Sequence, residues 1–429
     1  MVSLFGREFD SPQVHCRKRM YNFNFLRMKN KLLMSILLIG MTVISCSDEM
    51  IEKSAPSENS DLISEVQSLR VTNDFLKSLN KTTSTRSLIS ADLYPNYYGG
   101  YYIGLNRKPV FMVVKGLETM AQTDIEKRTN SNYFSIEPCT YSYNQLNSVR
   151  MELRKKFADE TLESLIEQLG WVGHYIDQQD NCIYVLLQSC LDSDVAAFKE
   201  KVNDSPLIRF KEGEMIVLPS AKESLQKSRA VGVTELGAGG FINNQGYGDG
   251  SAGYRAKYYG SEGFVTAGHV AYAAGREIGF VSGGPRIGMC EYSIMGGSNM
   301  VDAAFISFYS PYRMTTSTAY KKTPLSDDIV LLGVNDYVQK EGGTTFWSAG
   351  TVTQVGVDMR FTSPDGKIQY NVKNLTVATY NSDSGDSGGI VYSQYLGQIA
   401  GIHIAGNKAD KHYYLPADDV NAALGTEMY

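Results

Sequence analysis

The sequence predicts an all-β carboxy-terminal half preceded by a mixed α+β region. Of the 40 glycines, 31 lie after residue 230, where tyrosine is frequent and short apolar runs alternate with turn residues. This pattern is typical of strands joined by tight turns. The preceding half mixes helical and strand patterns instead. We therefore place a domain boundary at residues 227–230.

Composition excludes several classes of protein. The 429 residues carry 41 Lys and Arg against 46 Asp and Glu, a formal charge of −5. No basic footprint for nucleic acid is present, so nucleic acid is not an expected partner. Hydrophobic residues make up 43% of the chain, enough to bury a core and to exclude wholesale disorder. The length suggests two or three structural units.

The cysteines and histidines argue against metal or redox chemistry. The six cysteines form no CxxC pair, and the five histidines form no HExxH motif. A zinc site, a thioredoxin-type site and a disulfide-dense scaffold are therefore disfavoured. We expect no metal and no cofactor.

The amino-terminal segment has the layout of an export signal. Lys29 and Lys31 precede an apolar run from Leu32 to Ile44, which ends at Ser45-Cys46. The run is shorter than the roughly 20 residues that span a bilayer as a helix. Residues 43–46 resemble the lipobox of bacterial lipoproteins, which implies a lipid on Cys46 and a membrane tether. A plain signal peptide is the alternative, and Met28 is a possible true start.

Three chemically specific segments follow in the glycine-rich half. His269 ends the apolar run 263–269, Asp302 begins the run 300–306, and Ser387 lies in the glycine-rich loop 384–389. A serine hydroxyl becomes a nucleophile only when a base takes its proton and a carboxylate orients that base. His269 and Asp302 fit these two tasks. Without a Cβ at Gly385, its N–H and that of Ser387 can turn toward one developing oxyanion.

The segments TAGHV, VDAAF and GDSGG resemble the triad motifs of chymotrypsin-like (trypsin-fold) serine proteases, and GFVTAGH is similar to the streptogrisin and alpha-lytic protease branch. The resemblance covers about residues 231–429. It implies two six-stranded β-barrels with the triad in the cleft between them: His269 as general base and acid, Asp302 as orienter, Ser387 as nucleophile. It also implies that Asp386 is structural and paired with a buried cation, either a new N-terminal amine or an internal arginine.

The sequence departs from this family at two places. Val270 stands where relatives often carry a disulfide cysteine, and Cys290 is the only cysteine in the domain. The domain is therefore expected to hold together without an internal disulfide. Ile404 stands where relatives carry a serine that supports the triad aspartate, so we expect Asp302 to lack one hydrogen bond.

The segment 401–406 also bears on specificity. GIHIAG resembles the GxHxxG segment of glutamyl endopeptidases, which implies that His403 lies in the primary pocket and that the strand, with Ile404 and Gly406, binds substrate backbone. Ser382 and Ser384 could donate hydrogen bonds to a substrate carboxylate. Asn381 stands where trypsin-like enzymes keep a carboxylate. We expect cleavage after Glu or Gln; a packed, hydrogen-bonded His403 is the alternative.

The remaining chain completes the predicted layout. Residues 1–45 form the signal peptide, 46–90 a polar, lipid-bearing tether, 91–229 an α+β pro-region, and 230–429 the protease domain. Helices are expected over 148–169 and 192–202, with strands at 182–188 and near 207–210. A removable pro-region can assist the folding of a barrel and block its cleft, and residues 222–229 offer a polar cut site. A permanent accessory domain is the alternative.

The predicted function is a serine endopeptidase that acts on proteins or peptides, either anchored in the bacterial cell envelope or secreted. A non-catalytic surface-binding module on the same fold is the alternative, and its mark would be a damaged triad. The sequence leaves the oligomeric state open.

Overall fold

The computed structural model describes residues 58–80, 94–218, 234–244, 247–280, 284–363, 365–407 and 411–429. The predicted signal peptide, Cys46 and the predicted cut site at 222–229 lie outside the described residues. We call residues 58–218 the amino-terminal region and residues 234–429 the barrel half.

The first barrel is closed by a bent segment that pairs on both sides. β10 pairs with β9, and the chain continues through Ala252–Tyr254 into β11, which pairs with β12. The other neighbours are β12–β15, β15–β14, β14–β13 and β13–β9, so the ladder returns to its start. The strands are β9 (Phe241–Asn244), β10 (Gly248–Ser251), β11 (Arg255–Tyr258), β12 (Ser261–Thr266), β13 (Glu277–Gly279), β14 (Arg286–Gly296) and β15 (Val301–Phe308).

The second barrel is closed by a β17–β18 pairing. Its strands follow the order β17, β20, β21, β22, β19 and β18, and β18 pairs again with β17. They are β17 (Tyr337–Gly342), β18 (Phe346–Thr362), β19 (Gln369–Ala378), β20 (Ile390–Ser393), β21 (Ile399–Gly406) and β22 (His412–Pro416). With β10 and β11 counted as one strand, each barrel has six strands, so the expected double barrel is confirmed.

Shorter elements complete the barrel half. They are β8 (Glu235–Ala238), α6 (Gly268–Ala271), η2 (Gly297–Asn299), β16 (Arg313–Thr318), α7 (Ala417–Leu424) and β23 (Glu427–Met428). The apolar faces of both barrels join in one cluster that includes Phe264, Phe305 and Ile402, each without exposed surface. The thiol of Cys290 is free and buried within it.

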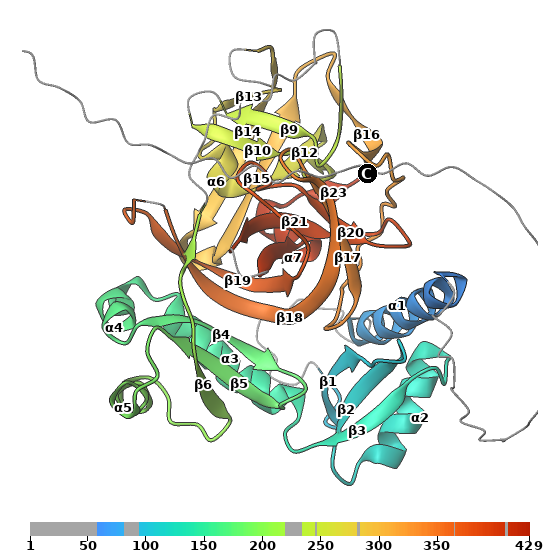
Figure 1. The fold of residues 1–429 in the computed structure, drawn as a ribbon, viewed down its shortest axis with the longest axis vertical. Helices are drawn as coiled ribbons and strands as arrows, with labels where there is room; N and C mark the ends of the chain where they lie inside the picture. The colour runs from blue at the N-terminus through green and yellow to red at the C-terminus, as the bar shows by residue number, and fades with distance from the viewer. Residues whose placement is uncertain are drawn as a thin grey trace, which may run out of the picture. The chain divides into compact units, whose positions relative to one another are not determined.

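The amino-terminal region contains two α/β layers (Figure 1). The first has β1 (Tyr98–Ile103), β2 (Pro109–Val114) and β3 (Ser135–Cys139), with α1 (Glu58–Asn80) and α2 (Glu118–Thr129). The second has β4 (Trp171–Asp177), β5 (Cys182–Leu187) and β6 (Ile208–Glu212), with α3 (Tyr143–Phe157), η1 (Glu160–Leu162), α4 (Glu163–Gln168) and α5 (Asp192–Lys201). β4 pairs with β18, so the second layer extends the sheet of the second barrel.

The structure corrects two local predictions. Residues 58–80, expected within a polar tether, form α1, because Val71, Phe75 and Leu79 recur at helical spacing and bury their side chains. The single helix expected over 148–169 is two helices. α3 ends at Phe157, and Asp159 caps the following turn η1 by accepting from Thr161 N–H.

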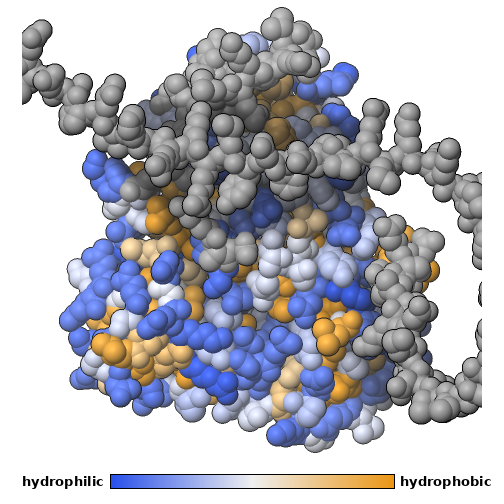
Figure 2. All heavy atoms as spheres, viewed as in Figure 1, coloured by the Kyte–Doolittle hydropathy of each residue, from blue (hydrophilic) through white to orange (hydrophobic). Residues whose placement is uncertain are grey.

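The hydropathy of the surface and of the helices can be described for the residues that the structure places. Figure 2 shows mainly polar residues, with small apolar groups between them, over the amino-terminal region in the lower part of the view. Among the described residues, no helix has the length and apolar character to cross a bilayer.

Candidate active site

His269 and Asp302 meet at the edge of the first barrel. β12 leads into the short helix α6, which contains His269, and Asp302 lies at the start of β15. His269 Nδ1 lies 2.7 Å from Asp302 Oδ2, and the His269 backbone N–H donates to Oδ1 at 2.9 Å. Burial favours the neutral acid, but the His269 imidazole and the hydrogen bonds to the carboxylate lower the pKa of Asp302 below its ordinary value. This arrangement fixes the tautomer of His269 with its proton on Nδ1.

Asp302 has a third donor that the sequence did not predict. The Tyr370 hydroxyl, on β19, donates to Asp302 Oδ2 at 2.7 Å, and both groups are buried. The expectation that Asp302 lacks one hydrogen bond is therefore wrong. A tyrosine from another strand occupies the supporting role that Ile404 cannot fill, because Ile404 has no side-chain donor.

Ser387 lies in the loop between β19 and β20 and is 3% exposed. Ser387 and His269 line one cavity of about 200 Å³. The Ser387 hydroxyl donates to the backbone oxygen of Ile404 at 3.0 Å. His269 Nε2 has no hydrogen-bond partner among the described residues. His269 and Ser387, the candidate base and the candidate nucleophile, thus share a cavity, and the Ser387 hydroxyl donates to a backbone oxygen.

The loop before Ser387 has a conformation that requires glycine. Gly385 has a φ of +97°, and a Cβ there would lie 2.4 Å from Thr344 Oγ1. Among the described residues, the N–H groups of Gly385 and Ser387 have no hydrogen-bond partner. Two backbone donors near a nucleophile can stabilise a developing oxyanion.

Asp386 is held by a buried lysine. Lys340 Nζ on β17 lies 2.7 Å from Asp386 Oδ2, and neither side chain is exposed. Thr345 Oγ1 donates to the same oxygen at 2.6 Å, and the N–H groups of Thr344 and Thr345 donate to Oδ1. Burial raises the pKa of Asp386, but the charge of Lys340 and the hydrogen bonds to the carboxylate together lower it, and the net shift is downward. The cation is therefore neither an amino terminus nor an arginine, the two alternatives that the family resemblance left open.

Two of the residues predicted to set specificity, Ser382 and His403, each form a hydrogen bond with another side chain, and the two bonded pairs are in contact. Ser382 Oγ lies 2.7 Å from His412 Nδ1, and the Tyr380 hydroxyl lies 3.0 Å from His403 Nδ1. The Tyr380 ring also stacks on His412, with ring centroids 5.5 Å apart. Burial lowers the pKa of His403 well below its usual value, so this imidazole is neutral at neutral pH.

Backbone and loop residues border these pairs. A Cβ at Gly406 would lie 2.6 Å from Ser382 Oγ and 2.3 Å from His412 Nδ1, so this strand edge must be glycine. Ser384 lines the catalytic cavity, and Asp383 is exposed. Sequence reasoning missed His412, because the residues around it form no motif. The pairing of β22 with β21 brings it here.

The amino-terminal region reaches the same cavity. β7 (Ile216–Val217) runs parallel to the end of β18, and Leu218 N–H donates to Thr362 O at 2.8 Å. The Leu218 side chain is buried and lines the cavity that contains His269 and Ser387.

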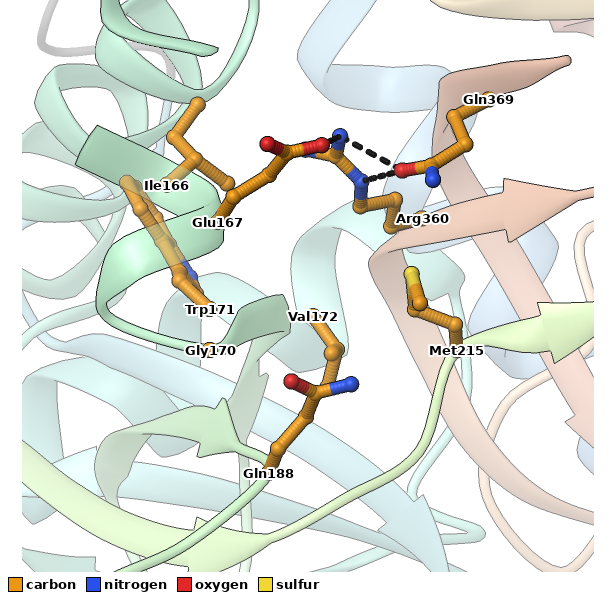
Figure 3. Close-up of a pocket in the computed structure, with 9 residues that line it drawn as sticks. All are labelled: Ile166, Glu167, Gly170, Trp171, Val172, Gln188, Met215, Arg360 and Gln369. Carbon is orange, nitrogen blue, oxygen red and sulfur yellow. Dashed lines mark hydrogen bonds and ion pairs between the residues drawn. The ribbon is translucent and has the colours of Figure 1, made fainter. Parts of the chain in front are cut away.

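Buried charges join the second α/β layer to β18. Arg154 on α3 donates to both oxygens of Asp358, at 2.6 and 2.8 Å, and His174 Nε2 lies 3.2 Å from Oδ2. Nearby, Arg360 on β18 donates to Gln369 Oε1 and lies 3.5 Å from Glu167 Oε1 on α4 (Figure 3). The contact between the region and the barrel half is therefore specific and ionic.

Comparisons with known proteins found one family model and several solved structures that are similar to parts of this chain. A family model described as a Pro-like C-terminal domain matches residues 144–213, the second α/β layer. No curated protein matches the chain. Among solved structures, a glutamic-acid-specific serine protease, described as using a histidine triad in substrate binding, is 26% identical, with a TM-score of 0.38; the match covers 45% of this chain and 99% of that one. Protease A of Thermobifida fusca is 20% identical over 45% and 97% of the two chains, with a TM-score of 0.38. A chymotrypsin of Cellulomonas bogoriensis is 22% identical over 46% and 98%, with a TM-score of 0.37.

Proposed function

We propose that this chain, whose barrel half has the two-barrel fold of chymotrypsin-like serine proteases, is a serine endopeptidase. One observation carries the proposal: the His269–Asp302 pair, joined at 2.7 Å, shares a cavity with Ser387. A serine that shares a cavity with an oriented imidazole and two free backbone donors has the parts that acyl transfer needs.

The mechanism follows from the hydrogen bonds at rest. When a substrate N–H donates to the backbone oxygen of Ile404, it replaces the hydrogen bond that the Ser387 hydroxyl makes there. The Ser387 hydroxyl then turns and donates to His269 Nε2. The hydroxyl attacks the carbonyl carbon while Nε2 takes its proton, and Asp302 stabilises the imidazolium. The N–H groups of Gly385 and Ser387 hold the oxyanion. His269 then gives the proton to the leaving amine, and water repeats the sequence to release the acid.

Labelling with a fluorophosphonate probe tests this proposal, because the probe reacts with an activated serine whatever the substrate. We expect covalent labelling of the parent at Ser387 and none of Ser387→Ala. Ser193→Ala, at an exposed position on α5, is the matched control and retains labelling. A parent that is folded and never labels would favour a non-catalytic binding module.

The primary pocket is proposed to prefer Glu or Gln. The raised pKa of Tyr380 keeps its proton, so its hydroxyl can donate to His403 Nδ1 and leave the ring proton on Nε2 for a substrate oxygen. Ser382 and His412 supply a second polar pair. A peptide library should be cleaved mainly after Glu or Gln. In Ser382→Ala, the ratio of cleavage after Glu or Gln to cleavage after other residues should fall about tenfold. Cleavage dominated by Lys or Arg contradicts the proposal.

The amino-terminal region is proposed to be a removable pro-region. Leu218 in the catalytic cavity and β7 along β18 support a role in blocking the cleft. We expect the parent to be trimmed after Leu218, near residue 229, while Ser387→Ala stays full length. Equal trimming of both proteins would assign the cut to another protease; no trimming of either would favour a permanent accessory domain.

Export and anchoring are proposed from the sequence alone. Cys46 is expected to carry lipid in the mature chain, which places the protein in the cell envelope. Intact-mass measurement of the exported protein tests this, and an unmodified Cys46 thiol contradicts it.

A further inference from the structure

An aromatic pair stands at the edge of the catalytic cavity. Tyr247, between β9 and β10, and Tyr272, at the end of α6, stack with ring centroids 4.8 Å apart and planes at 27°. Both line the cavity that contains His269 and Ser387. Their side chains are 42% and 43% exposed, so neither belongs to the core.

The backbone at Tyr272 is strained, and its neighbours hold it so. Tyr272 has φ +67° and ψ −53°, and Ala273 N–H donates to Ala271 O at 2.9 Å. This is the γ-turn with positive φ, which is rare for a residue with a side chain. The buried Asn244 side chain donates to the oxygens of Val270 and Ala271, at 3.0 and 2.8 Å, and fixes the turn. Strain that is maintained beside catalytic groups indicates a function for the ring it presents.

The Arg276 guanidinium makes cation–π contacts with both rings. The Arg276 guanidinium lies 3.8 Å from the Tyr247 ring centroid and 5.9 Å from that of Tyr272, and it also donates to the Tyr247 hydroxyl. Cation–π contacts of this kind orient aromatic rings. The pair is thus a preformed, partly exposed aromatic surface.

The position of the pair assigns it to one side of the scissile bond. His269 must pass its proton to the leaving amine, so the end of its own helix faces the leaving-group side. The substrate residues before the scissile bond are expected to bind along the edge of β21. Tyr272 ends the helix of His269, and Tyr247 stacks on it.

We propose that Tyr247 and Tyr272 bind the first substrate residue after the scissile bond and select large apolar or aromatic side chains there. This inference rests on the proposed function. Stacked rings provide a flat apolar surface that favours such side chains over glycine or aspartate.

Acyl transfer separates this inference from the proposed function. A blocked peptide thioester with Glu at the acyl position forms the acyl-enzyme, and amino-acid amides then compete with water for it. The amine nitrogen attacks the acyl carbon, Ser387 Oγ leaves, and the amine proton returns to Ser387 through His269. The ratio of aminolysis to hydrolysis reports binding on the leaving side alone.

In the purified, exported parent, we expect phenylalanine and leucine amides to exceed glycine amide about tenfold as acceptors. Tyr272→Gly and Tyr247→Ala should each reduce this acceptor preference severalfold. Glycine is chosen at position 272 because it adopts the positive φ of that residue readily. Tyr259→Ala, at a 91% exposed position on the β11–β12 turn, is the control and should retain it.

Two outcomes overturn the inference in different ways. If the parent forms no acyl-enzyme and does not react with a fluorophosphonate, the proposed function fails and this inference fails with it. If the acyl-enzyme forms but the acceptor preference is the same in parent and variants, the pair does not bind the leaving side and the proposed function stands.

Discussion

Replacing Lys340 with methionine should destabilise the barrel half and disable its nucleophile loop. The Lys340–Asp386 pair has no exposed surface, and the Asp386 carboxylate accepts further hydrogen bonds from Thr344 and Thr345. The variant leaves that carboxylate buried without its cation. Breaking one side of a buried ion pair costs about 3–5 kcal/mol, a large part of the 5–15 kcal/mol that usually stabilises a domain.

Urea unfolding at pH 7 measures the loss, and fluorophosphonate labelling measures the state of the loop. We expect the variant to unfold at lower urea and to label more slowly, because Asp386 lies between Gly385 and Ser387. Lys257→Met makes the same chemical change at an exposed pair, 3.4 Å from Glu262, and should change stability by at most about 1 kcal/mol. A Lys340→Met protein as stable as this control would refute the reasoning.

The pH dependence provides a second check. The folded-state pKa of Asp386 lies below its unfolded value, so the contribution of its charged form is complete above about pH 4 and is lost as the pH falls. In Lys340→Met the buried Asp386 carboxylate has lost the cation that lowers its pKa, so it takes up a proton at a higher pH than in the parent. The difference in stability between the parent and Lys340→Met should therefore shrink as the pH falls from 7. A difference that grows on acidification would contradict this account.

Three further outcomes are expected. Tyr370→Phe should lower the free energy of unfolding by about 1.5–3 kcal/mol in urea, because Asp302 loses a charge-assisted hydrogen bond; no change would remove Tyr370 from that role. Asp358→Asn should flatten the acid limb of a stability–pH curve, because the folded-state pKa of Asp358 is depressed and its contribution disappears as the pH falls; an unchanged limb would contradict this. Phe75→Ala should cost about 3–5 kcal/mol and raise hydrogen exchange in α1, whereas a polar tether would be insensitive to it.

The sequence predicts the features that depend on local chemistry. The loop around Gly385 and the runs that end at His269 and begin at Asp302 carry their constraints within a few residues, so a short motif is enough to identify them. The pattern of the glycine-rich half similarly predicts strands, and the family resemblance implies that they form two barrels, which the structure has.

Features that depend on pairing between distant strands could not be predicted. Tyr370 reaches Asp302 across 68 positions, and Lys340 reaches Asp386 across 46. The residues next to Tyr370 and Lys340 in the sequence form no motif, because each donor has its role only through the carboxylate that the fold brings near. Helix α1 was missed for another reason: much of its composition is polar, and the burial of its apolar residues depends on the fold, as when Leu69 joins the buried cluster that contains Val338 and Val391.

The two buried carboxylates take their partners from different parts of the chain, which bears on the proposed pro-region. Asp386 is held by Lys340, Thr344 and Thr345, all from β17 and the turn into β18. Asp358 lies toward the other end of β18, within the last of the irregularities between 352 and 359, and its carboxylate accepts from Arg154 of the amino-terminal region. The contacts that shape the nucleophile loop are therefore internal to the barrel half. Loss of the amino-terminal region would remove the partner of Asp358 and the Leu218 side chain from the cavity while leaving the contacts of Asp386 intact, as a removable inhibitor requires and as a permanent part of the catalytic site does not.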